Sequence, residues 1–297
     1  MTTTQKPSVE IIGKTAVIRW NQNGEQYVHK LHRGSLLGGQ DSNAKLETNE
    51  RPTKGLSMTP HIVRGLGAPI GNVCPYATIA CAAACLVHTG NGRLDNVQKG
   101  RLARRLFWQF DRKTFYAWLQ FELAMFNAEC GLDGVTGLVR LNVFSDIRHE
   151  LYIDLSVFSN LLFYGYTKWP PHKRSNRAPN HHLTYSYTGE GDSLQIALDY
   201  LAAGGNVAVV FADEEVKKRT GKWAHLQPLP AEWNGYPVID GSITDDRTTD
   251  PAGSVVGLVL RARSAADRRE ALRTDFVQLV DSTQKVLAQS KRKQVTS

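Results

Sequence analysis

Three of the four cysteines in this 297-residue chain lie close together, in the segment NVCPYATIACAAACLVHTGNGRL at residues 72–94. Cys74, Cys81 and Cys85 give the spacing C-x6-C-x3-C. Cys81 and Cys85 are four residues apart, so a helix would place both thiols on one face. Four cysteines are too few for a secreted disulfide scaffold, and clustered cysteines in a reducing compartment more often bind metal or do redox work.

An iron–sulfur cluster held by these three thiolates is the favoured interpretation, because such clusters are usually held by cysteine thiolates. The four alanines among residues 80–84 give the clearance that a bulky inorganic cluster needs. Gly90 and Gly92 allow the backbone to come close. Three thiolates would leave one iron of a four-iron cluster open to substrate, water or a cofactor.

Three alternatives stay open for the same cysteines. Zinc is one, with His88 as the fourth ligand, although no second pair with zinc-finger spacing follows. A dithiol redox pair is another, although C-x3-C differs from the C-x2-C of thioredoxin-like sites. Buried structural cysteines are the third. Cys130, in AECGLDG, is interpreted as a structural thiol, with a role as fourth ligand as the alternative.

The composition indicates a globular protein with a basic surface. The formal net charge is +8, and the positive residues fall in scattered stretches such as KWPPHKRSNR and KKRTGK. Such a surface could attract the phosphates of nucleic acid, or it could be an ordinary solvated surface. The first residues lack the apolar core of a signal peptide, and no apolar run is long enough for a transmembrane helix. We expect a cytoplasmic protein with no membrane partner.

The pattern along the chain predicts an α/β fold. A β-hairpin is expected at residues 8–30 and a loop at 33–53, followed by the cysteine segment and two helices, the second capped by Asp111. Parallel strands are expected at 138–144, 162–167, 182–187, 206–211, 237–240 and 255–260, with a helix near 193–204 and a closing helix at 265–288. This alternation favours a complete or partial (β/α) barrel, with a doubly wound sheet as the alternative.

Polar side chains follow several of these strands. In a (β/α) barrel the carboxyl ends of the strands converge on one face, where active sites lie. We therefore expect a shared pocket near the cysteines, although the same residue types also form turns and helix caps. The side chains predicted to line it are Asn142, Ser145, Asp146, Lys168, Ser186 and Asp240.

The motif order resembles a known family. The segments CPYATIACAAACL with GNGR, VRLNVFSDI, FYGYTK, HHLTYSYTG, NVAVVF, VIDGSITDDR and VVGLVLRAR resemble gene-product-88-like phage proteins, related to phage iron–sulfur proteins with a radical-SAM-like barrel. The resemblance covers roughly residues 54–263. It implies a 4Fe-4S cluster on Cys74, Cys81 and Cys85, with S-adenosylmethionine as a candidate cofactor that binds the open iron. It also implies a phage-encoded protein that works in the host cytoplasm.

The sequence therefore leads to two hypotheses about function. The first is an enzyme with radical-SAM-like chemistry at the mouth of the barrel. The second is a non-catalytic cluster protein that senses redox state or binds nucleic acid or a host partner. In both, residues 1–53 form an N-terminal extension, 54–290 the barrel domain and 291–297 a basic tail.

Overall fold

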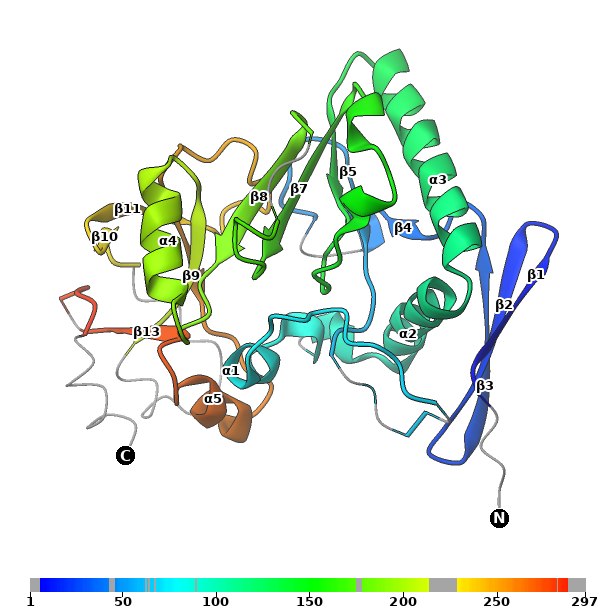
Figure 1. The fold of residues 1–297 in the computed structure, drawn as a ribbon, viewed down its shortest axis with the longest axis horizontal. Coiled ribbons are helices and arrows are strands. Elements are labelled where there is room, and N and C mark those ends of the chain that lie inside the picture. The colour runs from blue at the N-terminus through cyan, green and yellow to red at the C-terminus, as the bar shows by residue number, and fades with distance from the viewer. Residues whose placement is uncertain are drawn as a thin grey trace. The chain divides into compact units, whose positions relative to one another are not determined.

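A computed structural model describes residues 6–42, 46–61, 63, 65–66, 68–88, 90–174, 178–213, 229–281 and 283–287. Its contacts divide the chain into two compact units. Unit 1 comprises residues 1–75, 90–165 and 176–182, and unit 2 comprises 76–89, 166–175 and 183–297. Figure 1 labels the helices and strands of both units.

Unit 1 begins with a three-stranded antiparallel sheet of β1 (Ser8–Ile12), β2 (Thr15–Gln22) and β3 (Glu25–His32). The predicted hairpin is therefore one strand short. Gly13 has a φ of +60°, a backbone conformation that glycine adopts at little cost, and the turn there splits the segment in two. Alternate residues of β2, including Ile18 and Trp20, are buried in the core of the unit.

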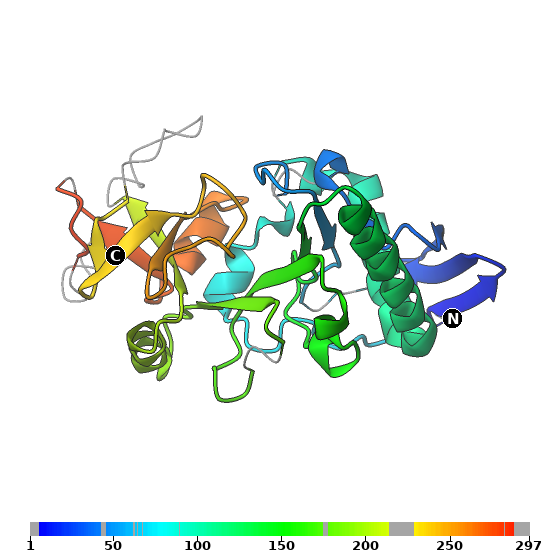
Figure 2. The ribbon, with the colours of Figure 1, turned by 90° about the horizontal axis from the view of Figure 1, so that it is seen from above.

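Two long helices follow the cysteine segment, as predicted. They are α2 (Asp95–Phe110) and α3 (Arg112–Leu132). The Asp111 carboxylate accepts a hydrogen bond from the Thr114 N–H at 3.2 Å and caps α3, which confirms the cap prediction. Both helices bury apolar side chains in the unit 1 core, and α3 runs beside the strands of the unit (Figure 1 and Figure 2).

The strands of the α/β part form a large, mostly parallel sheet. In unit 1, β5 (Thr53–Leu56) pairs with β6 (Gly137–Arg140), and β6 with β7 (Leu161–Thr167), all in parallel. The two-residue β4 (Leu37–Gly38) pairs antiparallel with β5. The predicted loop at 33–53 thus contains a short strand and the 3-10 turn Gln40–Ser42.

In unit 2, β9 (Val207–Asp213) is central. It pairs in parallel with β8 (His181–Ser186), β12 (Val255–Val259) and β13 (Val277–Val280). β11 (Tyr236–Asp240) continues beyond β12 in parallel, and β10 (Glu232–Trp233) ends the sheet antiparallel. Figure 1 shows α4 (Ser193–Ala202) against β9, and α1 (Ile79–Ala83) beside α5 (Ala265–Ala271).

The prediction of parallel strands is confirmed for the pairs β6–β7, β8–β9, β9–β12 and β11–β12, whereas a barrel is not confirmed. The described sheet of unit 1 ends at β4 and that of unit 2 ends at β10, so neither part closes on itself. A mixed α/β fold with a mostly parallel sheet is what the structure establishes.

The closing helix predicted at 265–288 is wrong for most of its length. Its first turns form α5, capped by Ser264, whose hydroxyl accepts from the Asp267 N–H at 3.1 Å. The chain then turns and forms the buried strand Val277–Val280. Strand pairing with β9 outweighs the helical spacing of the apolar residues here. Between β6 and β7, the segment YIDLSVFSNLL contains the 3-10 turn Leu155–Val157.

Candidate functional site

Cys74 lies in unit 1, on the loop that precedes α1, and the end of β6 holds its position. Its thiol donates to the Phe144 carbonyl at 3.5 Å, and its N–H donates to the Asn72 side chain at 2.8 Å. One residue earlier, the Val73 carbonyl accepts the Asp146 N–H at 2.8 Å. Hydrogen bonds thus join the Cys74 loop to the segment that follows β6, where the sequence predicted polar strand-end residues.

Asn142 and Ser145 build that segment. The Asn142 amide oxygen accepts from the Ser145 hydroxyl at 2.8 Å and from the Ile147 N–H at 2.9 Å, and its amide nitrogen donates to the Ile147 carbonyl at 2.9 Å. Asn142, Ser145 and Asp146 are each less than one-tenth exposed. The structure therefore brings these three predicted residues close to Cys74, with Asn142 and Ser145 engaged in forming the turn.

Two arginines of α2 lie near the segments that hold Cys74: Arg105 interacts electrostatically with the thiol, and Arg101 lies over the ring of Phe144. Arg105 is completely buried, and its guanidinium donates to the carbonyls of Thr59, His61 and Gly71. Burial lowers the pKa of Arg105 to about 10, and the negative charge that Cys74 carries when ionised opposes that shift. The Arg101 guanidinium stacks 4.3 Å from the centre of the Phe144 ring.

The sequence analysis missed both arginines. Their helix pattern GRLARRLF places Arg101 and Arg105 four residues apart on one face, next in sequence to the buried Leu102 and Leu106. Charged residues on an apolar helix stripe are the signal that could have identified them, because a buried guanidinium needs hydrogen-bonding partners.

Cys81 and Cys85 belong to unit 2. Cys81 is in α1, where its N–H donates to the N-cap hydroxyl of Thr78 at 3.1 Å. Its side chain packs on a small core cluster that includes Ala80 and Ala271. Helix α1 ends at Ala83, so Cys85 lies beyond the helix rather than on the shared helical face that its spacing suggested. Both cysteines are partly exposed.

His88 and Cys130 were the two candidates for a fourth ligand, and the structure describes the side chain of Cys130 alone. Residues Leu86–His88 form a 3-10 turn, but the His88 side chain lies outside the described residues. Cys130, on α3, is only 2% exposed and packs in the unit 1 core. Burial raises the pKa of its thiol, which favours the neutral form. Its structural role agrees with the prediction.

The remaining predicted strand-end residues all fall in unit 2. The Lys168 ammonium lies 5.3 Å from the centre of the Phe276 ring. Ser186 ends β8 and pairs with Ala208 of β9. Asp240 accepts from the N–H and the hydroxyl of Ser242, at 2.8 and 2.6 Å, in an exposed turn. The carboxylate of Asp240 thus does the turn chemistry that the sequence left as its alternative role.

A metal group is not seen in the described chain. Among its His, Cys, Asp and Glu residues, no three or more are grouped so as to hold an ion. The predicted ligands divide between the units, with Cys74 in unit 1 and the other two in unit 2. The described helices also include none that is long and apolar enough to cross a membrane.

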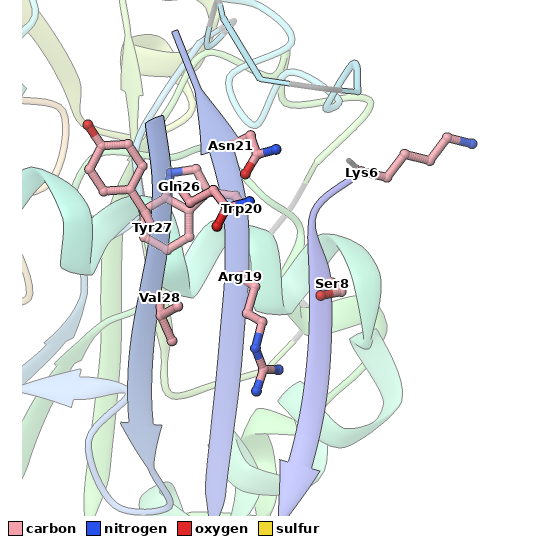
Figure 3. Close-up of a pocket in the computed structure, with 8 residues that line it drawn as sticks. All are labelled: Lys6, Ser8, Arg19, Trp20, Asn21, Gln26, Tyr27 and Val28. Atoms are coloured by element: carbon pink, nitrogen blue, oxygen red, sulfur yellow. The ribbon is translucent and has the colours of Figure 1, made fainter. Parts of the chain in front are cut away.

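A small cavity of about 70 Å³ opens on the N-terminal sheet (Figure 3). Its lining comes from β1, β2, β3 and the residue before them, and it includes no thiol, carboxylate or imidazole. The cavity is therefore unrelated to a metal site. The lining residues are Lys6, Ser8, Arg19, Trp20, Asn21, Gln26, Tyr27 and Val28.

Comparison with known proteins gives one match. A family model described as Gene product 88 matches residues 35–275, which is well over half of the chain. No curated protein and no solved structure matches. The match agrees with the family resemblance read from the motifs, and it extends that resemblance towards the N-terminus.

Proposed function

This chain belongs to the gene product 88 family, and we propose that it binds an iron–sulfur cluster through the thiolates of Cys74, Cys81 and Cys85. One contrast carries the proposal. The three cysteines that are close in sequence are all partly exposed thiols, whereas the isolated Cys130 is buried. Exposed thiols can be deprotonated and bind metal, whereas buried apolar ones are inert.

The surroundings of each ligand favour a bulky anionic group. Beside Cys74, Arg105 supplies positive charge that would offset the charge of the thiolate, and Arg101 lies over the ring of Phe144, whose carbonyl accepts from the Cys74 thiol. Around Cys81, the neighbours in sequence are alanines, which leave space on the exposed side of α1. A structural zinc ion would need a fourth protein ligand, and a zinc ion of either kind would not need this clearance, so the donor set fits a cluster better.

The more specific part of the proposal is a partial, radical-SAM-like barrel. Its support is the run of parallel strands and the family resemblance. Cys74, Cys81 and Cys85 would hold three irons of a four-iron cluster, and the fourth iron would be open to the amino and carboxylate groups of S-adenosylmethionine. Cleavage of its sulfonium would consume one electron, which the reduced cluster would supply and an external electron donor would replace. The segment held by Asn142 and Ser145 would then form one wall beside Cys74. A phage origin and a host-cytoplasm location belong to the same proposal.

The direct test is anaerobic purification with quantification of iron and acid-labile sulfide. We expect brown protein with near-equal iron and sulfide. Cys74→Ala, Cys81→Ala and Cys85→Ala should each lose the cluster, and Cys130→Ala is the matched control that should keep it. Stoichiometric zinc without sulfide would contradict the proposal.

The state of the fourth iron is tested in the same preparations. Under the proposal, His88→Ala keeps the cluster, and its electron paramagnetic resonance signal changes when S-adenosylmethionine is added. Loss of the cluster in that variant would identify His88 as a ligand and remove the main support for an enzyme. An intact signal that ignores S-adenosylmethionine would leave a non-catalytic cluster protein.

A further inference from the structure

Apart from Lys168, which was predicted to line the pocket near the cysteines, the basic segment KWPPHKRSNR has no role in the proposed cluster site. Its described part lies in unit 2 and forms an ordered surface. The ring of Trp169 lies 4.6 Å from the ring of Tyr76, at an interplanar angle of 58°. The Lys173 ammonium donates to the Tyr76 hydroxyl at 3.1 Å and lies 5.5 Å from the ring centre. These three residues form what we call the aromatic–lysine cluster.

Hydrogen bonds from the loop itself fix this cluster. The Thr167 hydroxyl, which is only 4% exposed, accepts from the Trp169 N–H at 3.1 Å and from the Arg174 guanidinium at 3.3 Å. The Pro170 carbonyl accepts the Lys173 and Arg174 N–H groups at 2.8 and 3.0 Å. The cluster is therefore preorganised, so a ligand would bind it at a lower entropic cost.

The two segments that form the cluster carry basic residues and no acidic ones. Segments 75–94 and 166–177, which supply its residues, contain no Asp or Glu. Both aromatic rings are partly exposed, and His172 and Lys173 are exposed. Arg174 is buried and bonds within the loop, so the surface charge comes from the lysines. Exposed aromatic rings beside cations are the combination that binds unpaired bases and their phosphates.

We propose that the aromatic–lysine cluster binds single-stranded nucleic acid. Tyr76 and Trp169 stack on unpaired bases, and Lys173, with Lys168 on the same loop, contacts the phosphate backbone. Duplex DNA is a poorer fit because its bases are already stacked on each other. The stacking is tolerant of sequence, because every base presents an aromatic face. None of the residues of the aromatic–lysine cluster is a predicted ligand of the proposed iron–sulfur cluster, so the two proposals can be tested separately.

The test measures fluorescence anisotropy of a labelled oligothymidylate of about 20 nucleotides, long enough to cover a typical site. The full chain should bind the single strand more tightly than a duplex of equal length. Trp169→Ala should weaken binding roughly tenfold, as expected for the loss of one stacked base. Trp169→Phe keeps an aromatic ring and should recover most of the affinity. Lys173→Ala should reduce the slope of log affinity against log salt by about 0.7.

The matched control is Lys30→Ala, which removes the same charge from an exposed position on β3 of unit 1. It should change affinity less than Lys173→Ala does. Equal losses in the two lysine variants would mean that net charge alone drives binding and would overturn the proposal. Three other results would also overturn the proposal. They are tighter binding to the duplex than to the single strand, no binding to the single strand, and binding to phosphatidylserine vesicles as tight as binding to the single strand. Circular dichroism of Trp169→Ala shows whether this variant is folded, so that a loss of binding is not confused with a loss of structure. If Trp169→Ala unfolds, the affinities of Trp169→Phe and Lys173→Ala for the single strand still test the proposal.

Discussion

Cys74 and Cys81 are seven residues apart, and the chain holds them in different ways. Around Cys74, in unit 1, the neighbours include buried polar groups. The guanidinium of Arg105 donates to the Gly71 carbonyl of the Cys74 loop, and the Val73 carbonyl of that loop accepts the Asp146 N–H. Around Cys81, in unit 2, the neighbours form an apolar cluster that includes Ala80 of α1 and Ala271 of α5. The first thiol is positioned by directional hydrogen bonds and the second by close packing.

This difference predicts different vulnerabilities. A hydrogen-bonded loop is destabilised when a donor is removed, because buried carbonyls then have no partner. A packed alanine layer fails when volume is added, because the backbone must move apart. The three changes that follow probe the two environments, and their expected effects run from the largest to the smallest.

The largest effect is expected for Arg105→Met in unit 1. Methionine keeps much of the length but donates no hydrogen bond, so the carbonyls of Thr59, His61 and Gly71 lose their buried partner. We expect about 3 kcal/mol or more of destabilisation, measured by urea and thermal unfolding. The control is Arg93→Met, because Arg93 is exposed, and it should change stability by less than about 0.5 kcal/mol. Similar losses in both variants would mean that the Arg105 hydrogen bonds do not hold the loop.

A smaller effect is expected for Ala80→Leu in unit 2. Ala80 is 1% exposed and packs in the same cluster as Ala271 of α5, so a larger side chain must push α1 away. We expect a loss of about 1–3 kcal/mol. Ala82→Leu, on the exposed side of the same helix, is the matched control and should be nearly neutral. If the two variants unfold alike, close packing does not position Cys81.

The smallest effect is expected in the pH dependence of folding stability, through Glu122 of unit 1. The buried Glu122 carboxylate accepts the N–H groups of Gly34, Leu36 and Leu37 at 3.0, 2.9 and 2.8 Å. Burial nevertheless raises the pKa of Glu122, against the opposing effect of these bonds and of Arg104. The folded chain then holds the proton more tightly than the unfolded chain does. The stability that Glu122 contributes is therefore fully present below the ordinary pKa of Glu, and it is lost as pH rises through the raised pKa of the folded chain.

Comparing stability curves of the wild type and Glu122→Gln across that pH window measures this contribution. Glutamine does not titrate, so the fall in stability with rising pH should be shallower in the variant, whatever its absolute stability. An identical slope in both proteins would show that Glu122 does not cause it.

Much of the fold could be predicted from sequence because its signals are local. The apolar run NVAVVF predicted β9, and the Asp111 cap with its apolar stripe predicted α3. The parallel strand pairings followed from the alternation of strands and helices. The errors came where contacts distant in sequence outweigh local pattern. The segment at 277–280 has helical spacing, but pairing with β9 makes it a strand.

The same division applies to the candidate site. The sequence alone determined which residues are available for chemistry, because thiol type and spacing are written in the chain, and it indicated that Cys130 stands apart. Only the tertiary structure decided that Cys130 is buried while the other three thiols are partly exposed. It also decided that Asn142 forms a turn beside Cys74 and that Arg105 ties the nearby loop. Burial and hydrogen bonding of this kind depend on residues tens of positions apart, and no local pattern of residues records them.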